Sequence, residues 1–302
     1  DSMEKQRNKK GSLPIGVRII GIIIAVLAAA YGLYAGMGNS TGNFDGEMQI
    51  FALDVGQGDS FFIISPNGKT MLIDSGESSN SKQIEQFIRE KGVRQLDVVI
   101  GSHTHSDHVG SMPYLLDAFD VGKYVMSEAG LETRIQKRIN AVLEEKDIPC
   151  SYVWAGDVID WDSDCKVTVL SPVPEFDEYS KTDWNEWSLI IRAEYANHSM
   201  IFTGDATVRS EQAAMLNNEK YLFDADVLKV PHHGSTTSSS LGFLEAVSPE
   251  YAIISVGKGN SYGHPDYDTI QKLKQVNAEI YRTDELGTIN IVFSADDIKI
   301  TY

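Results

Sequence analysis

The sequence His103-Thr104-His105-Ser106-Asp107-His108 places three imidazoles and one carboxylate within six residues, directly after a short apolar stretch. Alternate residues of an extended segment point the same way, so His103 and His105 face one position. Asp107 and His108 begin the next helix and face a second position. Imidazole nitrogen with carboxylate oxygen suits a borderline divalent ion, Zn²⁺ most readily and Mn²⁺ or Fe²⁺ next. The motif therefore predicts a loop that holds two adjacent metal ions.

Other segments at predicted strand ends supply further ligand types. Phe202-Thr203-Gly204-Asp205 offers a carboxylate, and Pro231-His232-His233-Gly234 offers two imidazoles. The alternative for the first motif is a histidine-rich surface turn without metal, and these added ligands argue against it. Gly56-Gln57-Gly58 follows the first predicted strand, and we expect it to let the backbone approach the metal loop closely.

Apolar periodicity after residue 47 predicts strands and helices in both halves of the chain. We expect strands over 48–55, 59–65, 70–73, 96–100, 123–126, 151–154, 166–170, 188–194, 199–203, 227–230, 251–255, 279–282, 288–293 and 298–302. We expect helices over 81–91, 111–119, 131–146, 210–216, 241–247 and 267–276. Strands flanked by helices in both halves predict an α/β fold with two sheets between helical layers.

The N-terminal segment predicts a membrane anchor. Residues 19–37 are 19 consecutive residues without a charge, and basic residues precede them. Such a run just spans a bilayer core, and the positive-inside bias places the basic side in the cytoplasm. We expect a cytoplasmic basic tail at 1–14, a transmembrane anchor at 15–37, a linker at 38–46 and an extracellular domain at 47–302. The rival is a cleaved signal peptide, which would leave a secreted protein.

The charge balance is strongly acidic. The formal net charge is −17, and residues 1–38 carry five basic and two acidic side chains, a net +3, so the remainder carries −17 − 3 = −20. A domain of this charge repels polyphosphate backbones at long range. We therefore expect no stable nucleic-acid complex, and DNA only as a transient substrate.

Cys150 and Cys165 are the two cysteines of the chain. They lie in a stretch that reads as two strands joined by Gly156 and Asp157. They form either a disulfide, which suits an exported domain, or two unpaired thiols.

The motif His-x-His-x-Asp-His resembles the signature loop of the metallo-β-lactamase superfamily. Flanking motifs sharpen the resemblance toward the hydrolase domain of ComEC-type DNA-uptake competence proteins over residues 48–302. These motifs are Asp54-Val55-Gly56-Gln57-Gly58-Asp59-Ser60, Leu72-Ile73-Asp74-Ser75-Gly76, Thr203-Gly204-Asp205, Val227-Leu228-Lys229-Val230-Pro231-His232-His233-Gly234-Ser235 and Tyr262-Gly263-His264-Pro265. The resemblance implies the αββα sandwich of that superfamily.

The resemblance also implies a ligand set for two divalent ions, Zn²⁺ or Mn²⁺. Asp205 would bridge both ions and orient the nucleophile, while Asp59 and Asp74 would support the metal loop. His233 is favoured over His232 as a ligand, and His232 then either supports the ligands from behind or contacts the phosphate. The implied ligands are His103, His105, Asp107, His108, Asp205 and His233.

Further residues are implied at the substrate. Many superfamily members carry another histidine shortly before the bridging aspartate, where this chain has Asn185, so the first metal lacks one imidazole unless His232 or another group completes it. We expect Asn185 and Ser235 to contact substrate, and His232 or His264 to donate a hydrogen bond to the developing anion. His264 also reads as a plain turn residue. Residues 238–240 read as a solvated loop.

The leading hypothesis is a phosphodiesterase or nuclease that acts outside the membrane through hydroxide activated by two metals. One alternative is a phosphoesterase that acts on cell-wall polymer or lipid, which tolerates an acidic surface better. Another alternative is a surface binding protein that keeps the fold without catalysis.

Overall fold

The computed structural model describes residues 46–174, 179 and 182–302. Contacts divide the chain into two units, 1–42 and 43–302, and the description begins within the second. The predicted cytoplasmic tail, membrane anchor and nearly all of the linker therefore lie outside the described residues. Within the described ranges, no helix combines the length and the apolar character needed to cross a membrane.

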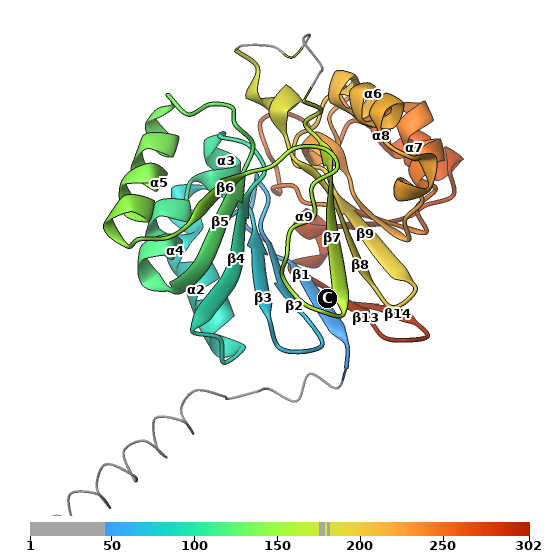
Figure 1. The fold of residues 1–302 in the computed structure, drawn as a ribbon. Helices are drawn as coiled ribbons and strands as arrows, with labels where there is room; N and C mark the ends of the chain where they lie inside the picture. Colours follow the sequence, from blue (N-terminus) through green and yellow to red (C-terminus); the bar gives the residue numbers. More distant parts are fainter. Residues whose placement is uncertain (1–45, 175–178, 180–181) are drawn as a thin grey trace, which may run out of the picture. The chain divides into compact units, whose positions relative to one another are not determined.

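The described elements alternate between strands and helices along the chain (Figure 1). The strands are β1 (Met48–Ala52), β2 (Phe61–Ile64), β3 (Thr70–Ile73), β4 (Gln95–Gly101), β5 (Asp120–Met126), β6 (Cys150–Tyr152), β7 (Cys165–Ser171), β8 (Ile190–Tyr195), β9 (His198–Phe202), β10 (Val227–Lys229), β11 (Tyr251–Ile254), β12 (Glu279–Arg282), β13 (Ile289–Phe293) and β14 (Ile298–Thr301). The helices are α2 (Ser81–Glu90), α3 (Ser106–Val109), α4 (Met112–Ala118), α5 (Arg134–Glu145), α6 (Val208–Asn217), α7 (Leu241–Val247), α8 (Tyr267–Gln275) and α9 (Thr283–Leu286). Short 3₁₀ turns are η1 (Ser78–Asn80), η2 (Trp184–Trp187), η3 (Lys220–Leu222) and η4 (Pro231–Gly234).

These strands form two mixed sheets. The eight-stranded sheet has the order β14-β13-β1-β2-β3-β4-β5-β6, and the six-stranded sheet has the order β12-β11-β10-β9-β8-β7. Strands β3 to β6 are parallel in the first sheet, and β9 to β12 are parallel in the second. The C-terminal strand β13 pairs with β1, with Met48 opposite Phe293.

Three clusters of buried apolar side chains pack between the layers of the fold. The first lies between the sheets, where Phe61 of β2 meets Phe202 of β9 edge to face at 5.2 Å. The second packs the eight-stranded sheet against α2, α4 and α5, and the third packs the six-stranded sheet against α6, α7 and α8. The molecule is thus layered helix, sheet, sheet, helix, and the predicted α/β fold with two mixed sheets between helical layers is confirmed.

The parallel strands position the site. Asp74 directly follows β3, His103 follows β4, Asp205 follows β9 and the two histidines of η4 follow β10. The carboxyl ends of neighbouring parallel strands share one edge of a sheet, and ligands gather there in α/β proteins. The two sheets therefore bring their polar strand ends together from opposite sides of the central core.

The expectation of a solvated loop at residues 238–240 is wrong. Ser238 and Ser239 are fully buried rather than solvated. Glu211 of α6 accepts hydrogen bonds from the backbone N–H groups of Ser239 and Ser240 at 2.6 and 2.9 Å. These N–H groups of the loop therefore have hydrogen-bond partners. The two strands expected around Gly156 are present as β6 and β7, and they belong to different sheets: β6 ends the eight-stranded sheet and β7 ends the six-stranded one.

The two cysteines carry free thiols. Burial, with the nearby carboxylates of Asp162 and Asp164, raises the pKa of the Cys165 thiol to about 12. Because only the thiolate reacts, about one Cys165 in 10⁴ is reactive at pH 8. We expect iodoacetamide to leave Cys165 of the native protein unmodified at pH 8 and to modify it after denaturation, as read by peptide mass spectrometry. Rapid native labelling, or a Cys150–Cys165 disulfide, would contradict this.

Candidate metal centre

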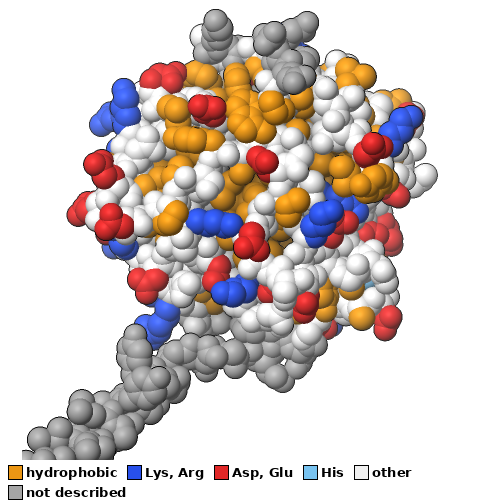
Figure 2. All heavy atoms as spheres, viewed as in Figure 1, with side chains coloured by type: hydrophobic (Ala, Val, Ile, Leu, Met, Phe, Trp, Pro, Cys, Tyr) orange, Lys and Arg blue, Asp and Glu red, His pale blue; other side chains and the backbone are white. Residues whose placement is uncertain are grey.

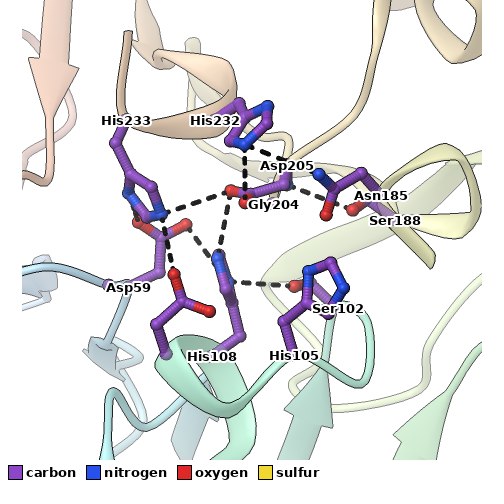
Figure 3. A network of polar contacts seen from close by, with 12 residues as sticks. Asp59, Ser102, His105, His108, Asn185, Ser188, Gly204, Asp205, His232 and His233 are labelled. Atoms are coloured by element: carbon purple, nitrogen blue, oxygen red, sulfur yellow. Dashed lines mark hydrogen bonds and ion pairs between the residues drawn. The ribbon is translucent and has the colours of Figure 1, made fainter. Parts of the chain in front are cut away.

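Of three groups of possible metal ligands among the described residues, two share Asp205 and converge at the shared edge of the sheets. One group joins Asp107, His108, Asp205 and His233, and the other joins His103, His105 and Asp205. Within each group one ligand atom per residue lies within 4.8 Å of the others. Asp205 belongs to both groups, and Figure 3 shows its carboxylate between the histidines of η4 and those of the loop after β4.

Asp205 is held in place from both sides. Its backbone N–H donates to Ser188 Oγ at 3.1 Å, and its side chain is buried. Its Oδ1 lies 3.0 Å from His108 Nε2 and 3.5 Å from His233 Nε2, while its Oδ2 lies 3.9 Å from His103 Nε2. One carboxylate therefore faces both groups, which is the arrangement that a bridging ligand needs.

Asp74 orients the histidine loop from behind. Its Oδ1 accepts from the Ser102 backbone N–H at 2.8 Å, and its Oδ2 accepts from Ser102 Oγ at 2.6 Å. The same Oδ2 lies 2.8 Å from His108 Nδ1. A hydrogen bond at Nδ1 fixes the ring so that Nε2 points at Asp205, which is the usual support for a metal-bound histidine.

The two histidines of η4 point to different places. Both have left-handed backbones, with φ of 52° at His232 and 54° at His233. His233 is buried, its Nδ1 donates to the Ser255 carbonyl at 2.9 Å, and its Nε2 lies 3.5 Å from both Asp107 Oδ2 and Asp205 Oδ1. His232 is partly exposed, with Nδ1 2.9 Å from Thr237 Oγ1 and Nε2 3.6 Å from Asp205 Oδ2. The turn thus aims His233 into the ligand group and His232 at its open side (Figure 3).

The residues fit divalent metal ions. Three buried atoms, His108 Nε2, His233 Nε2 and Asp205 Oδ1, have no hydrogen-bond partner among the described residues. A buried polar atom without a partner costs about 1–3 kcal/mol, and a cation between these atoms removes that cost. His103 Nε2 and His105 Nδ1 lie 3.1 Å apart, near the roughly 3.3 Å edge of a tetrahedron built on Zn–N bonds of about 2.0–2.1 Å.

The carboxylates attract positive charge to this place. Burial alone would lower the pKa of His233, but Asp205, Asp107 and Asp59 outweigh it and raise that pKa to about 9. Burial opposes the charge of His108 as well, yet Asp205, Asp59 and Asp74 raise its pKa well above the ordinary value. Protons and metal ions therefore compete for the same ring nitrogens.

Lys229 is a buried cation that the sequence did not lead us to predict. Its ammonium contacts the Asp59 carboxylate and donates to the Gly204 carbonyl at 2.6 Å, and its Nζ lies 3.9 Å from Asp205 Oδ1. The side chain is 1% exposed. The available signal was a charged residue inside the apolar run Val227-Leu228-Lys229-Val230, which needs a buried partner.

The expected close approach of backbone to the metal loop occurs at Gly58. Its φ is +133°, and a Cβ there would collide with the Asp107 carbonyl oxygen. The next residue, Asp59, donates its backbone N–H to the same oxygen at 3.2 Å. Gly58 is therefore required so that the connection between β1 and β2, which carries Asp59, can lie against α3.

An open cleft of about 320 Å³ leads to the centre. His264 and Asn185 line it beside His232, and Asn185 Nδ2 lies 3.5 Å from His232 Nε2. The other lining residues are Gln57, His105, Ser106, Asp107, Asp205, His233 and Tyr262.

Ser235 differs from its expected position. It is buried and is not among the cleft-lining residues, and its Oγ lies 3.1 Å from Thr237 Oγ1. Thr237 in turn contacts His232. Ser235 therefore lies beside the histidine turn, outside the lining of the cleft, and its contact with substrate stays a prediction.

Comparison with known proteins shows the family to which this chain belongs. A family model described as the metallo-β-lactamase superfamily matches residues 53–258. The chain belongs to the metallo-β-lactamase superfamily. Metallo-β-lactamase relatives include ComE operon protein 3 of Bacillus subtilis (strain 168), 34% identical over 260 residues that cover 80% of this chain and 33% of that protein. Competence protein ComA of Neisseria gonorrhoeae is 28% identical over 256 residues, 84% of this chain and 34% of that protein.

The chain thus spans about a third of the length of these curated relatives. Among solved structures, Igni18, described as a metallo hydrolase from Ignicoccus hospitalis, matches with a TM-score of 0.55 at 15% identity. The match covers 82% of this chain and all of that one. At this identity the match shows a shared fold only. Together with the family model, it indicates the metallo-β-lactamase fold of a metallohydrolase family.

Proposed function

We propose that this chain is a phosphodiesterase that cleaves DNA with two divalent ions, Zn²⁺ or Mn²⁺. The observation that carries the proposal is Asp205, whose one carboxylate faces two separate ligand groups at the floor of an open polar cleft. Two ions about 3.5–4 Å apart are the usual arrangement for phosphodiester hydrolysis. The names of the competence-protein relatives support DNA as the substrate class.

In the proposed mechanism His103, His105 and Asp205 would hold one ion, and Asp107, His108, His233 and Asp205 would hold the other. Bound ions would supply Lewis acidity toward a phosphoryl oxygen and toward water. Asn185 and His264 line the cleft, where their polar groups can orient a phosphate. Asn185 Oδ1 is buried without a hydrogen-bond partner among the described residues.

His232 is the proposed donor to the charged phosphoryl oxygen. Burial lowers the pKa of His232 and so favours the neutral ring. When Thr237 donates to Nδ1, the ring carries its proton on Nε2, which faces Asp205 and the cleft. A hydrogen bond placed where charge develops typically contributes about 10²- to 10³-fold in kcat.

The two neighbouring histidines give a matched pair of variants. We expect His233→Ala to weaken metal binding by more than about 10-fold, since even residues behind the ligands contribute about 10- to 100-fold. We expect His232→Ala to retain metal but to lose about 10²- to 10³-fold in kcat. Metal content by mass spectrometry and steady-state kinetics separate the two outcomes. Equal metal loss in both variants would remove the distinct role of His232.

The charge distribution bears on the alternatives. Lysine and arginine side chains are scattered among acidic ones on the face in Figure 2, and none lines the cleft among its described residues. This favours a transient encounter with DNA over a stable complex. It also keeps open the second candidate, hydrolysis of phosphoesters on cell-wall polymer or lipid.

One assay tests the proposal against these alternatives. The full chain, supplied with Mn²⁺ or Zn²⁺, is given single-stranded DNA and bis(p-nitrophenyl) phosphate. We expect cleavage of both. Cleavage of the small diester alone would reject the nuclease and favour the cell-wall or lipid phosphoesterase. Stoichiometric metal without any turnover would favour the non-catalytic binding protein.

We also propose that residues 15–37 anchor the chain, with the catalytic domain outside the membrane. The support is the uncharged run at 19–37 after a basic stretch. Membrane fractionation of the full chain, with protease added to intact cells, tests both parts. Full-length protein in the medium or protected catalytic domain would reject this location.

A further inference from the structure

The loop between β11 and α8 places an exposed aromatic ring at the rim of the cleft. Tyr262 is 69% exposed and lines the same cleft as Asp205 and His232. Exposure alone is common for tyrosine, as at Tyr221, so the informative observation is that the Tyr262 ring lines the cleft that leads to the candidate metal centre.

The ring of Tyr262 continues an aromatic path into the cleft. It stacks on His264, with ring centroids 5.7 Å apart and planes inclined by 21°. His264 in turn lies 5.9 Å from His232, with its ring edge to face. His264 is much less exposed than Tyr262, and its Nδ1 is buried with no hydrogen-bond partner among the described residues. His264 therefore backs the tyrosine from the side of the candidate metals.

The loop that carries Tyr262 is tied down. Asn260 Oδ1 accepts from the backbone N–H groups of Tyr262 and His264, both at 3.1 Å. Asn260 Nδ2 donates to the carbonyls of Gly257 and His264 at 3.0 and 2.7 Å. One side chain thus makes four hydrogen bonds across the loop. The ring is exposed on a fixed support, which lowers the entropy lost when a ligand stacks on it.

The charges around the cleft make stacking more important. Among its described lining residues the charged groups with fixed sign are Asp107 and Asp205, and no lysine or arginine joins them. The phosphates of a bound strand therefore meet no lysine or arginine among these lining residues. Stacking of a base on an aromatic side chain contributes about 1–3 kcal/mol and does not depend on phosphate charge.

We propose that Tyr262, backed by His264, stacks on the nucleobase next to the phosphodiester that is cleaved. The site then selects nucleotides whose bases are unpaired, such as single strands and frayed ends, over duplex DNA and over phosphoesters without a base. This inference rests on the proposed phosphodiesterase function and adds the substrate class that the same cleft recognises.

The test compares two substrates with one leaving group, thymidine 5′-(p-nitrophenyl phosphate) and methyl p-nitrophenyl phosphate. The full chain with Mn²⁺ is compared with Tyr262→Ala and Tyr262→Phe. We expect Tyr262→Ala to lower the ratio of kcat/KM for the thymidine substrate over the methyl substrate by about 5- to 100-fold, mainly through KM. Tyr262→Phe keeps the ring and should keep most of this ratio. Tyr221→Ala is the matched control, because Tyr221 is equally exposed and does not line the cleft.

A binding measurement separates failure of this inference from failure of the proposed function. Anisotropy of a fluorescein-labelled single-stranded oligonucleotide is recorded with metal-free protein, so that no cleavage is needed. We expect Kd to rise by about 5- to 100-fold in Tyr262→Ala, and to rise similarly for the wild type with an abasic strand. An unchanged Kd, an unchanged substrate ratio or no binding by the wild type would overturn the inference. Base-dependent binding without any turnover would instead overturn the phosphodiesterase.

Discussion

Asp205→Asn is expected to lower kcat/KM on a phosphodiester by more than about 10²-fold and to reduce the bound metal. Asp205 is the residue that both ligand groups share, so its replacement weakens both. Replacing a residue that only supports a metal ligand typically lowers metal affinity or activity by about 10- to 100-fold. Loss of a bridging carboxylate should cost at least as much. Steady-state kinetics and metal analysis of the purified variant provide the measurement.

The amide of asparagine is nearly isosteric with the carboxylate, so the fold should persist and circular dichroism should be unchanged. Asp224→Asn is the control, because Asp224 is exposed in the connection before β10 and belongs to neither ligand group. If Asp205→Asn retained wild-type metal content and turnover, neither the shared-ligand geometry nor the mechanism built on it would stand.

Lys229→Met is expected to destabilise the metal-free protein by about 3–5 kcal/mol. The substitution removes the ammonium that contacts the buried Asp59 carboxylate, and a buried charge left without its partner costs about that much. Urea denaturation with EDTA measures the free energy of unfolding. Added metal should then raise the stability of the variant more than that of the wild type, because cations replace part of the missing positive charge.

Two further variants test the cause of this effect. Lys229→Met combined with Asp59→Asn removes both charges and should recover more than about 1 kcal/mol, as expected for residues in direct contact. Lys166→Met changes an exposed lysine of β7 and should alter stability by less than about 0.5 kcal/mol. A Lys229→Met protein as stable as Lys166→Met would show that the ion pair does not hold this part of the fold.

The sequence predicts the local part of the site well and the long-range part less well. The spacing of His103, His105, Asp107 and His108 is a property of one loop, so alternation and helix geometry predict which side chains point together. Contacts between residues far apart in the sequence cannot be predicted in this way. Lys229 and Asp59 are 170 positions apart, and their contact exists because β10 and the residues after β1 meet across two sheets.

The same limit applies to the sheets. Strand content followed from apolar periodicity, but the pairing of β13 with β1 joins residues about 240 positions apart and decides which sheet the C-terminal strands enter. Burial of Ser238 and Ser239 depends on Glu211 of another helix, so the polar composition of that loop pointed to solvent. The position of Ser235 outside the cleft lining, next to Thr237, also depends on how the histidine turn folds.

The centre takes ligands from both halves of the chain, with His103 to His108 carried by one sheet and Asp205 and His233 by the other. A half-folded chain therefore contains only fragments of the ligand set, and it cannot hold the ions that hydrolysis requires. Under the proposed function, activity would appear only after the two halves have docked. A molecule in which they have not docked would lack the complete ligand set, and with it the proposed hydrolysis.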